Sequence, residues 1–440
     1  MLKIILSDLH IGAGGTSNPL EDFVHDETFI GLLDDLAREG DATGGEVEVI
    51  LNGDAFEFWQ VPALCDSETF DPGARYPGRL YRGTTELACA RRMRLIIAGH
   101  RTLFDALARF IQPGPLRRTL TIIKGNHDLQ LHWPGVQDVL REALHAMGDR
   151  SSCLSFVPQT LMRDGLYVEH GNQYADALSR HASFAHPENA RRPTRLRETP
   201  GARIFIRAIN RMERDLPWIS SVKPLTALFW FLLRFRLRAA LRLAWLMLPS
   251  LPTILWVHHP LTRTNRQIAR QAAMDARTAS SDPGVSPAAQ VASRALQPSG
   301  PQPLSSLASL KALHEDCTLE SDPILSRGLL EEHALHAQLV EAAARIAHRY
   351  GARLVSFGHT HIPAFVSLPE GAVYVNSGTW TWELDLRGQP AEAWRRLIRE
   401  DSFAQDEYRL TYVRIDYIDS VPVPALRERM PAGVDIVAGE

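Results

Sequence analysis

The chain has 440 residues, of which 45% are hydrophobic and 22% are charged, and its formal net charge is −3. This size and balance are those of a soluble globular protein that can bury a sizeable core. A slightly negative chain has no general attraction for nucleic acid, so any basic surface must be local.

Apolar runs alternate with helical patterns over the first third of the chain. KIIL (3–6), VEVILNGD (47–54) and TLTIIKGNHD (119–128) predict buried strands, because each is short, apolar and bounded by polar residues. Residues 29–39 and 85–111 have helical spacing. Strands that alternate with helices predict an α/β sheet whose chemistry lies at the strand ends.

The pattern then changes to closely spaced strands. Residues 154–173 predict strands around a turn at Asp164 and Gly165. A helix and a strand at 339–361 resume the earlier alternation. AFVSL, AVYVNSGTW and YRLTYVRIDY predict antiparallel strands near the end of the chain.

Residues 172–331 differ in composition and in hydrophobic pattern from the segments on either side. The segment 278–306 is rich in Ser, Pro and Ala, which predicts a mobile loop. We expect a largely helical and partly disordered insertion here, which separates a first core part at 1–171 from a second at 332–440. His258 and His259 fall within it and are expected to form a structural pair.

The most apolar stretch of the chain, 224–257, lies in this insertion. Arginines interrupt it, so no run of about 20 apolar residues remains and a membrane-spanning helix is not expected. On a single helix, Arg234, Arg238 and Arg242 would share one face. Such a basic amphipathic helix could lie on an anionic bilayer, or it could pack inside the insertion with its arginines solvated or paired.

The four cysteines lie far apart and form no CxxC pair. We expect reduced thiols in a cytoplasmic protein and neither a disulfide framework nor a zinc knuckle. The chain opens on a strand pattern, MLKIILSDLH, without the features of a secretion signal. The cysteines are Cys65, Cys89, Cys153 and Cys317.

Five polar clusters stand on or near the ends of apolar runs. Strand ends on one edge of an α/β sheet converge in space, so these clusters can meet. Carboxylates and neutral imidazoles together suit Mn²⁺, Fe²⁺ or Zn²⁺. The clusters are SDLH with Asp8 and His10, NGDAFEFW with Asp54 and Glu57, GNHD with Asn126, His127 and Asp128, EHGNQ with His170, and GHTH with His359 and His361.

The ordered set DLH, GD, GNHD, HG and GHTH resembles the calcineurin-like metallophosphoesterases over residues 1–171 and about 345–415. The resemblance implies a four-layer β-sandwich of two mixed sheets flanked by helices, in place of a simple doubly wound sheet. It also implies two divalent metal ions, with Mn²⁺ the first expectation. By resemblance, one ion is held by Asp8, His10 and His361, the other by Asn126, His170 and His359, and Asp54 bridges both.

The resemblance further implies a hydrolytic mechanism. A hydroxide that bridges the metals is the expected nucleophile, because metal binding lowers the pKa of water to about 7. His127 is not assigned as a ligand and is expected to protonate the leaving oxygen as general acid. Glu57 or Asp128 could orient His127, and for both residues a structural role as a cap or an ion-pair partner stays open.

GDAFEFW followed by GHTHIP and NSGTW is similar to the branch that contains UDP-2,3-diacylglucosamine diphosphatases. That likeness implies a cytoplasmic enzyme, peripheral on the inner face of the membrane, which cleaves a lipid-bearing nucleotide pyrophosphate. Two features depart from the branch. Arginine usually stands where this chain has His127, and the insertion here is longer than a simple cap.

Other phosphoesterases share the metal motifs. A nucleic-acid phosphodiesterase would need a basic groove, and no dense Lys/Arg face appears in the core motif regions. A protein phosphatase would carry GDxxDRG, whose arginine is missing, because Trp59 follows Glu57 and Phe58. A non-catalytic scaffold would usually have lost ligands. We therefore expect a phosphoester or pyrophosphate hydrolase without a nucleic-acid partner.

Overall fold

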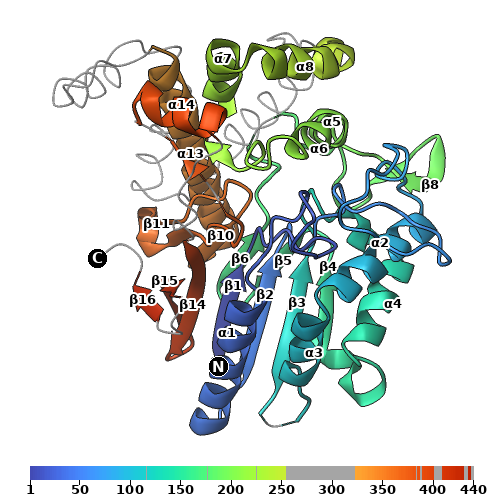
Figure 1. The fold of residues 1–440 in the computed structure, drawn as a ribbon. Coiled ribbons are helices and arrows are strands. Elements are labelled where there is room, and N and C mark those ends of the chain that lie inside the picture. Colours follow the sequence, from blue (N-terminus) through green and yellow to red (C-terminus); the bar gives the residue numbers. More distant parts are fainter. Residues whose placement is uncertain are drawn as a thin grey trace. The chain divides into compact units, whose positions relative to one another are not determined.

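Two mixed β-sheets form the centre of the fold (Figure 1). The computed structural model describes all residues except 115, 176, 224, 254–322, 383, 387–388, 401–408, 431–434 and 438–440. Within that part of the chain, the larger sheet has seven strands in the order β16-β15-β14-β1-β2-β3-β4. The smaller has five in the order β11-β12-β10-β6-β5.

Four parallel strands carry the larger sheet, and three antiparallel strands extend it beyond β1. Val, Ile and Leu dominate β1 and β2, as expected for parallel strands that are covered on both faces. The strands are β1 (Leu2–Leu6), β2 (Val47–Asn52), β3 (Arg118–Ile123), β4 (Leu154–Val157), β14 (Leu410–Ile418), β15 (Val421–Arg429) and β16 (Asp435–Val437).

The smaller sheet joins a hairpin to three strands from the second half of the chain. The predicted turn at Asp164 and Gly165 is confirmed, since both residues have positive φ and connect β5 to β6. β12 pairs antiparallel with β11, as predicted, but parallel with β10. The strands are β5 (Thr160–Arg163), β6 (Leu166–Glu169), β10 (Leu354–Phe357), β11 (Ala364–Ser367) and β12 (Val373–Asn376).

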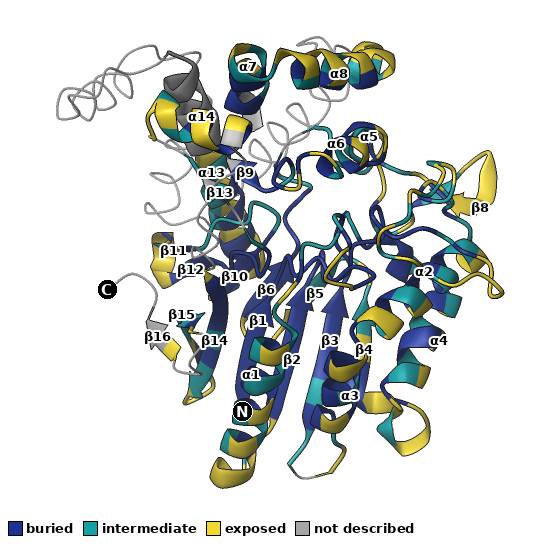
Figure 2. Ribbon diagram, viewed as in Figure 1, coloured by how far each residue is buried: buried dark blue, intermediate teal, exposed yellow. Residues whose placement is uncertain are grey.

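Alternate residues of the central strands face different layers. Ile5 and Ile50 belong to a buried cluster with Val168 and Val375 of the smaller sheet, so the two sheets pack face to face. Their neighbour Ile4 instead belongs to a cluster with the helices that cover the larger sheet. Most strand residues are therefore buried (Figure 2). The α/β class predicted from the alternating pattern is confirmed.

Helices cover the outer face of each sheet. The cluster beside the larger sheet contains residues of α1 to α4, and the cluster beside the smaller sheet contains residues of α13. These helices are α1 (Asp26–Thr43), α2 (Glu86–Gly99), α3 (Arg101–Phe110), α4 (Pro134–Ala143) and α13 (Pro323–Tyr350), with short helical turns η1 (Leu129–His132), η2 (Gly148–Cys153) and η5 (Pro369–Gly371).

The helical pattern at 85–111 is confirmed, but it forms two helices, because the chain breaks at His100 between α2 and α3. The break allows a close approach of two backbones. A Cβ on Gly99 would stand 2.0 Å from the carbonyl oxygen of Ala13. The His100 ring then bonds to Asp26 at 2.8 Å, a tertiary contact that helical periodicity does not contain.

Much of the described insertion is helical, as expected, with a hairpin before the helices. Helix α7 packs against α14, and β9 pairs with β13. The elements of the insertion are β7 (Glu188–Asn189), β8 (Arg192–Leu196), α5 (Pro200–Ile204), a π-helical turn η3 (Phe205–Ile209), α6 (Asn210–Glu213), β9 (Val222–Lys223), α7 (Leu225–Phe235), α8 (Leu237–Met247) and η4 (Leu248–Ser250). Their two partners from the later part of the chain are β13 (Leu384–Asp385) and α14 (Ala391–Glu400).

The apolar stretch does not form one helix. Arg236 has φ −145° and ψ 62°, which ends α7 before α8 begins. The prediction of a shared arginine face is therefore wrong, because Arg234 lies on α7 whereas Arg238 and Arg242 lie on α8. The break accompanies tertiary packing that the sequence pattern does not contain, since Phe231 of α7 stacks on Trp394 of α14 at 4.6 Å.

Two compact units follow from the contacts within the chain: Met1–Ser250 with Ile324–Glu440, and Leu251–Pro323. The insertion bounds 172–331 stay a prediction. His258, His259, Cys317 and the loop 278–306 lie outside the described residues, and described Cys65, Cys89 and Cys153 are free thiols. Among the helices that are described, none combines the length and apolarity needed to cross a membrane.

Candidate metal centre

The polar side chains predicted to meet do come together beyond the ends of five strands, β1, β2, β3, β6 and β10. Each of three groups has ligand atoms that lie within 4.8 Å of one another. The groups are Asp8, His10 and His361; Asp54, His170 and His359; and His10, Glu57 and His127.

The first group brings three possible ligand atoms close together. The ring nitrogens Nε2 of His10 and His361 are 3.2 Å apart, and Asp8 Oδ1 is 3.5 Å from the latter. Asp8 is fully buried, and its Oδ1 has no hydrogen-bond partner. Burial raises the pKa of this carboxyl, and the nearby Asp54 raises it further. A buried, unpaired oxygen beside two imidazole nitrogens fits a divalent cation.

The second group is organised by the tautomer of His170. Its Nδ1 donates to the backbone carbonyl of Asn52 at 3.1 Å, which leaves Nε2 to face Asp54 Oδ2 and Asn126 Oδ1, each at 3.1 Å. Burial opposes a charge on this ring, yet Asp54 raises its pKa to about 10. Three acceptor atoms converge here, so a proton or a cation must stand between them.

Asn126 thus joins the second group, as the sequence predicted. Asp54 lies with the same group, and its charge interacts with both Asp8 and His10 of the first. Its other oxygen, Oδ1, accepts from the backbone N–H of His127 at 2.8 Å. The bridging role predicted for Asp54 stays a prediction, and its position between the two groups is compatible with that role.

Backbone conformation explains the Asp-x-His and His-x-His spacing. Five of the predicted ligands have positive φ, which is uncommon outside glycine and costs about 1–3 kcal/mol per residue. When residues i and i+2 both adopt this left-handed conformation just beyond a strand, their side chains can turn toward one centre. These residues are Asp8 (φ 54°), His10 (50°), Asp54 (49°), His359 (70°) and His361 (62°).

Two glycines allow the loops to approach one another closely. A Cβ on Gly125 would lie 2.2 Å from Asp54 Oδ1, and one on Gly358 would lie 2.6 Å from Asp8 Oδ2. Any side chain at either position would displace a carboxylate that is predicted to be a ligand. The glycine of GNHD and that of GHTH are therefore part of the site through the space they leave.

Asp128 and Glu57 have different roles in the structure. Asp128 accepts from the backbone N–H of Ala55 at 2.8 Å and of Gly125 at 2.5 Å, so it ties the loop after β2 to the loop after β3. Burial, reinforced by Asp54, raises its pKa to about 7. Glu57 and Asp128 were both candidates for orienting His127. Only Glu57 has a hydrogen bond to the His127 ring, whereas Asp128 bonds to the backbone of the two loops.

Glu57 is hydrogen-bonded to two histidines. Its Oε2 accepts from His127 Nδ1 at 2.5 Å and from His10 Nδ1 at 3.0 Å. Burial disfavours the carboxylate, but the two imidazoles lower its pKa to about 2. The contact to His10 was not predicted. It turns His10 Nε2 toward Asp8 and His361, as a carboxylate does behind a metal-bound imidazole.

Several residues around His127 were missed by the sequence analysis. The Trp59 ring lies 3.6 Å from the His127 ring, centroid to centroid, and the Phe205 ring lies 5.4 Å away. Asn210 donates to the backbone carbonyl of Trp59 at 2.7 Å. Neither Phe205 nor Asn210 stands in a recognisable motif, because both reach the site only through the fold of the insertion.

The same insertion makes a second bond to the β2 loop. Glu213 is fully buried and accepts from Gln60 Nε2 at 2.5 Å and from Ser220 Oγ. Burial raises the pKa of Glu213 well above its ordinary value, and the nearby Asp22 adds to the shift. Helix α6 therefore holds residues 59–60, and with them the ring that covers His127.

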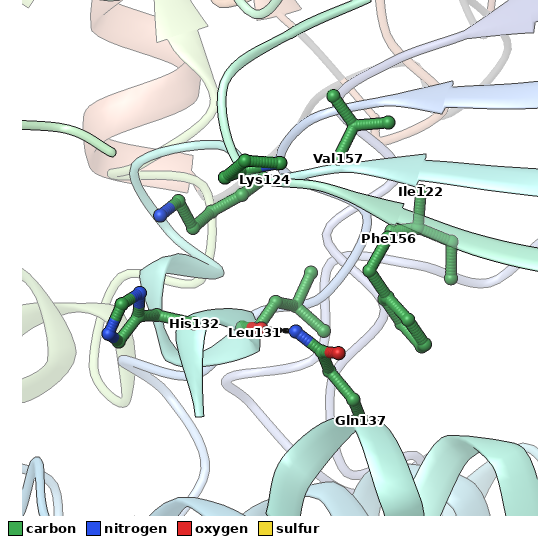
Figure 3. A pocket seen from close by; sticks show the side chains of 8 residues that line it. Ile122, Lys124, Leu131, His132, Gln137, Phe156 and Val157 are labelled. Carbon is green, nitrogen blue, oxygen red and sulfur yellow. Dashed lines mark hydrogen bonds between the residues drawn. The ribbon is translucent and has the colours of Figure 1, made fainter. Parts of the chain in front are cut away.

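A separate cavity of about 190 Å³ lies beside β3 and β4 (Figure 3). Ile122, Leu131 and Phe156 form apolar walls, and Lys124 donates to the backbone carbonyl of Phe184 at 2.9 Å. No residue of the three ligand groups lines this cavity. It is therefore distinct from the candidate metal centre.

Comparison with known proteins adds no relative: no protein-family model matches the chain, and no curated protein matches it. What remains to indicate a function is the geometry of the strand-end groups and the chemistry of their donor atoms.

Proposed function

We propose that this chain is a dimetal-dependent hydrolase of a phosphoester or pyrophosphate bond, of the calcineurin-like metallophosphoesterase type. The observation that carries the proposal is the convergence of two neighbouring donor groups from five strand ends. Each group combines buried carboxylate oxygen with imidazole nitrogen. The two sheets packed face to face, with helices outside, support the four-layer sandwich of that family.

The donor set suits two first-row divalent ions. Asp8, His10 and His361 would hold one ion, and Asn126, His170 and His359 the other, with Asp54 shared. Mn²⁺, Fe²⁺ and Zn²⁺ all accept such oxygen and nitrogen ligands, and Mn²⁺ is our first expectation. When bound, the ions would lower the pKa of a water molecule and stabilise negative charge on phosphoryl oxygens.

His127 would exchange a proton with the leaving oxygen. Its Nδ1 is committed to Glu57, so Nε2 is the atom that can carry the proton. The side chain is 14% exposed, which gives it access to a substrate while Trp59 and Phe205 limit its movement. Glu57 positions the ring, and it does so from a fully buried site.

The substrate is proposed as a lipid-linked phosphoester or a nucleotide-sugar lipid, like that of the UDP-2,3-diacylglucosamine diphosphatases. Exposed arginines on the insertion support an anionic substrate, among them Arg203, Arg207 and Arg211. Exposed apolar residues on α8 support a lipid partner. A nucleotide or nucleic-acid phosphodiesterase and a protein phosphatase stay alternatives on the same metal site.

A metal-reconstitution assay tests this function. The purified chain is stripped with a chelator, reloaded with Mn²⁺, Fe²⁺ or Zn²⁺, and assayed on an aryl monoester, an aryl diester and a nucleotide pyrophosphate. We expect two bound ions per chain and recovery of hydrolysis with at least one metal. A well-folded chain that binds no ion, or that hydrolyses equally well without one, would contradict the proposal.

A further inference from the structure

Two of the four lysines in the chain are buried with very different partners. Lys3 and Lys124 are both 2% exposed. Lys3 Nζ pairs with two carboxylates, Glu48 at 2.6 Å and Asp164 at 2.9 Å. Lys124 Nζ donates to the backbone carbonyl of Phe184 at 2.9 Å, and it forms no ion pair within the described part of the chain. Because a buried charge is ordinarily paired, Lys124 lacks the partner that Lys3 has.

Lys124 lines the cavity of about 190 Å³ beside β3 and β4 (Figure 3). Figure 3 shows the Lys124 side chain and the His132 ring on one side of this space and Phe156 on the other. The cavity thus combines a cationic side with an apolar one. A cavity of about 150 Å³ can hold benzene, so this one has room for a ring of that size and a small polar group.

The other polar groups around Lys124 are already engaged. Gln137 Nε2 donates to a backbone carbonyl of η1 at 2.8 Å, and His132 Nε2 bonds to Glu188 at 3.0 Å. The charges of Asp128 and Glu188 act on Lys124 without an ion pair, and Asp128 is bonded to backbone N–H groups. An ammonium has three N–H donors. Within the described residues, Lys124 therefore keeps donors for a ligand.

We propose that this cavity binds a small organic monoanion, a carboxylate on an apolar body about the size of a benzene ring. The carboxylate would accept from Lys124 Nζ and supply the missing counter-charge. The apolar body would lie against the walls formed by Ile122, Leu131 and Phe156. An inorganic anion would leave these walls uncovered, and a neutral apolar molecule would leave the ammonium unpaired.

Such a ligand would contact both ends of the loop that carries Asn126 and His127. Lys124 directly precedes this loop, and η1, which contains Leu131, directly follows it. The cavity nevertheless shares no lining residue with the three ligand groups of the candidate metal centre. Binding should stabilise the folded loop, because a ligand favours the state that binds it. The proposal does not depend on the hydrolytic function.

Isothermal titration calorimetry on the full-length protein tests the site with three probes. Benzoate has both the ring and the charge, benzyl alcohol has the ring without the charge, and acetate has the charge with little apolar surface. We expect benzoate to bind about tenfold or more tightly than either. Failure of benzoate to bind in the millimolar range, or equal affinity for benzoate and one of the other probes, would overturn the proposal.

Matched variants identify the residues that hold the probe. Lys124→Met keeps the length of the side chain without its charge, and it should weaken benzoate binding by about 10–100-fold. Arg141→Met is the control, since Arg141 lies over the Phe156 ring at 5.0 Å but does not line the cavity. It should bind benzoate like the unaltered chain. Leu131→Phe fills part of the cavity and should reduce binding of benzoate although Lys124 is retained.

A last variant separates this cavity from the candidate metal centre, because a carboxylate could also bind there. Asp54→Ala should leave benzoate affinity unchanged. Loss of binding in Asp54→Ala with unchanged binding in Lys124→Met would place the probe at the metal centre and overturn the proposal. Circular dichroism and thermal unfolding establish that each variant is folded. If Lys124→Met does not fold, Leu131→Phe and the three probes on the unaltered chain decide the outcome.

Discussion

The strand-end site buries polar groups, whereas helix α8 exposes apolar ones. At the strand ends, Asp8 and His170 are fully shielded from water, and Asp8 Oδ1 has no hydrogen-bond partner. On α8, Trp245 is 67% exposed. Each arrangement is unfavourable for an isolated folded chain, because unpaired buried oxygen and exposed apolar surface both raise its free energy. Each could be relieved by a ligand: we propose cations, which the first region could hold, and lipid at the second.

The largest expected effect comes from removing Asp54. Asp54→Ala takes away an oxygen that faces His170 and the proposed bridge between two cations. We expect hydrolysis to fall by about a thousandfold or more and the bound-metal content to decrease. The measurements are kcat on an aryl diester and elemental analysis. Asp34→Ala, an exposed residue on α1, is the control. Full activity in Asp54→Ala would exclude this residue from the site.

The next effect depends on the leaving group. His127→Ala should slow esters with alkyl leaving groups by about 10²–10⁴-fold, because such groups need a proton. Activated aryl esters should be slowed far less. The ratio of the two rate losses is the measurement. Equal slowing of both ester classes would mean that His127 does not act as an acid.

A smaller effect is expected from the bonds that join α6 to the loop after β2. Asn210→Ala removes the donor to the Trp59 carbonyl, which should loosen the ring beside His127. We predict a loss of about tenfold in kcat, with the same leaving-group preference as His127→Ala and little change in metal content. Asn189→Ala, on the hairpin strand β7, is the control. An equal loss of kcat on alkyl and aryl esters would show that Asn210 has only a structural role.

The smallest effect on hydrolysis is expected for His100, a buried residue outside the site, whose replacement should change the stability of the fold instead. Burial opposes a charge on His100, but bonds to Asp26 and Glu21 raise its pKa from 6.5 to about 9. A raised pKa stabilises the folded chain below pH 6.5, and this contribution is lost as the pH rises through 9. His100→Gln should therefore destabilise by about 3 kcal/mol more at pH 6 than at pH 10. Urea unfolding at both pH values measures this, and a pH-independent loss would contradict the charged His100.

Local patterns in the sequence were enough to indicate the strands and the polar groups that follow them. The apolar runs at 3–6 and 47–54 are short and bounded by polar residues, and at this length a strand is favoured over a helix. The spacing of Asp8 from His10 and of His359 from His361 was also informative. Each pair follows a strand, β1 in the larger sheet and β10 in the smaller, and the face-to-face packing of the two sheets brings these strand ends together.

Contacts between distant residues decided what the patterns could not. The break at His100 depends on the approach of Gly99 to Ala13, and the break at Arg236 accompanies the packing of α7 on α14. Glu57 reaches both His10 and His127 only because two loops meet. Periodicity records which face of an element is apolar, but the partner that covers that face, or leaves it exposed as on α8, is a property of the assembled fold.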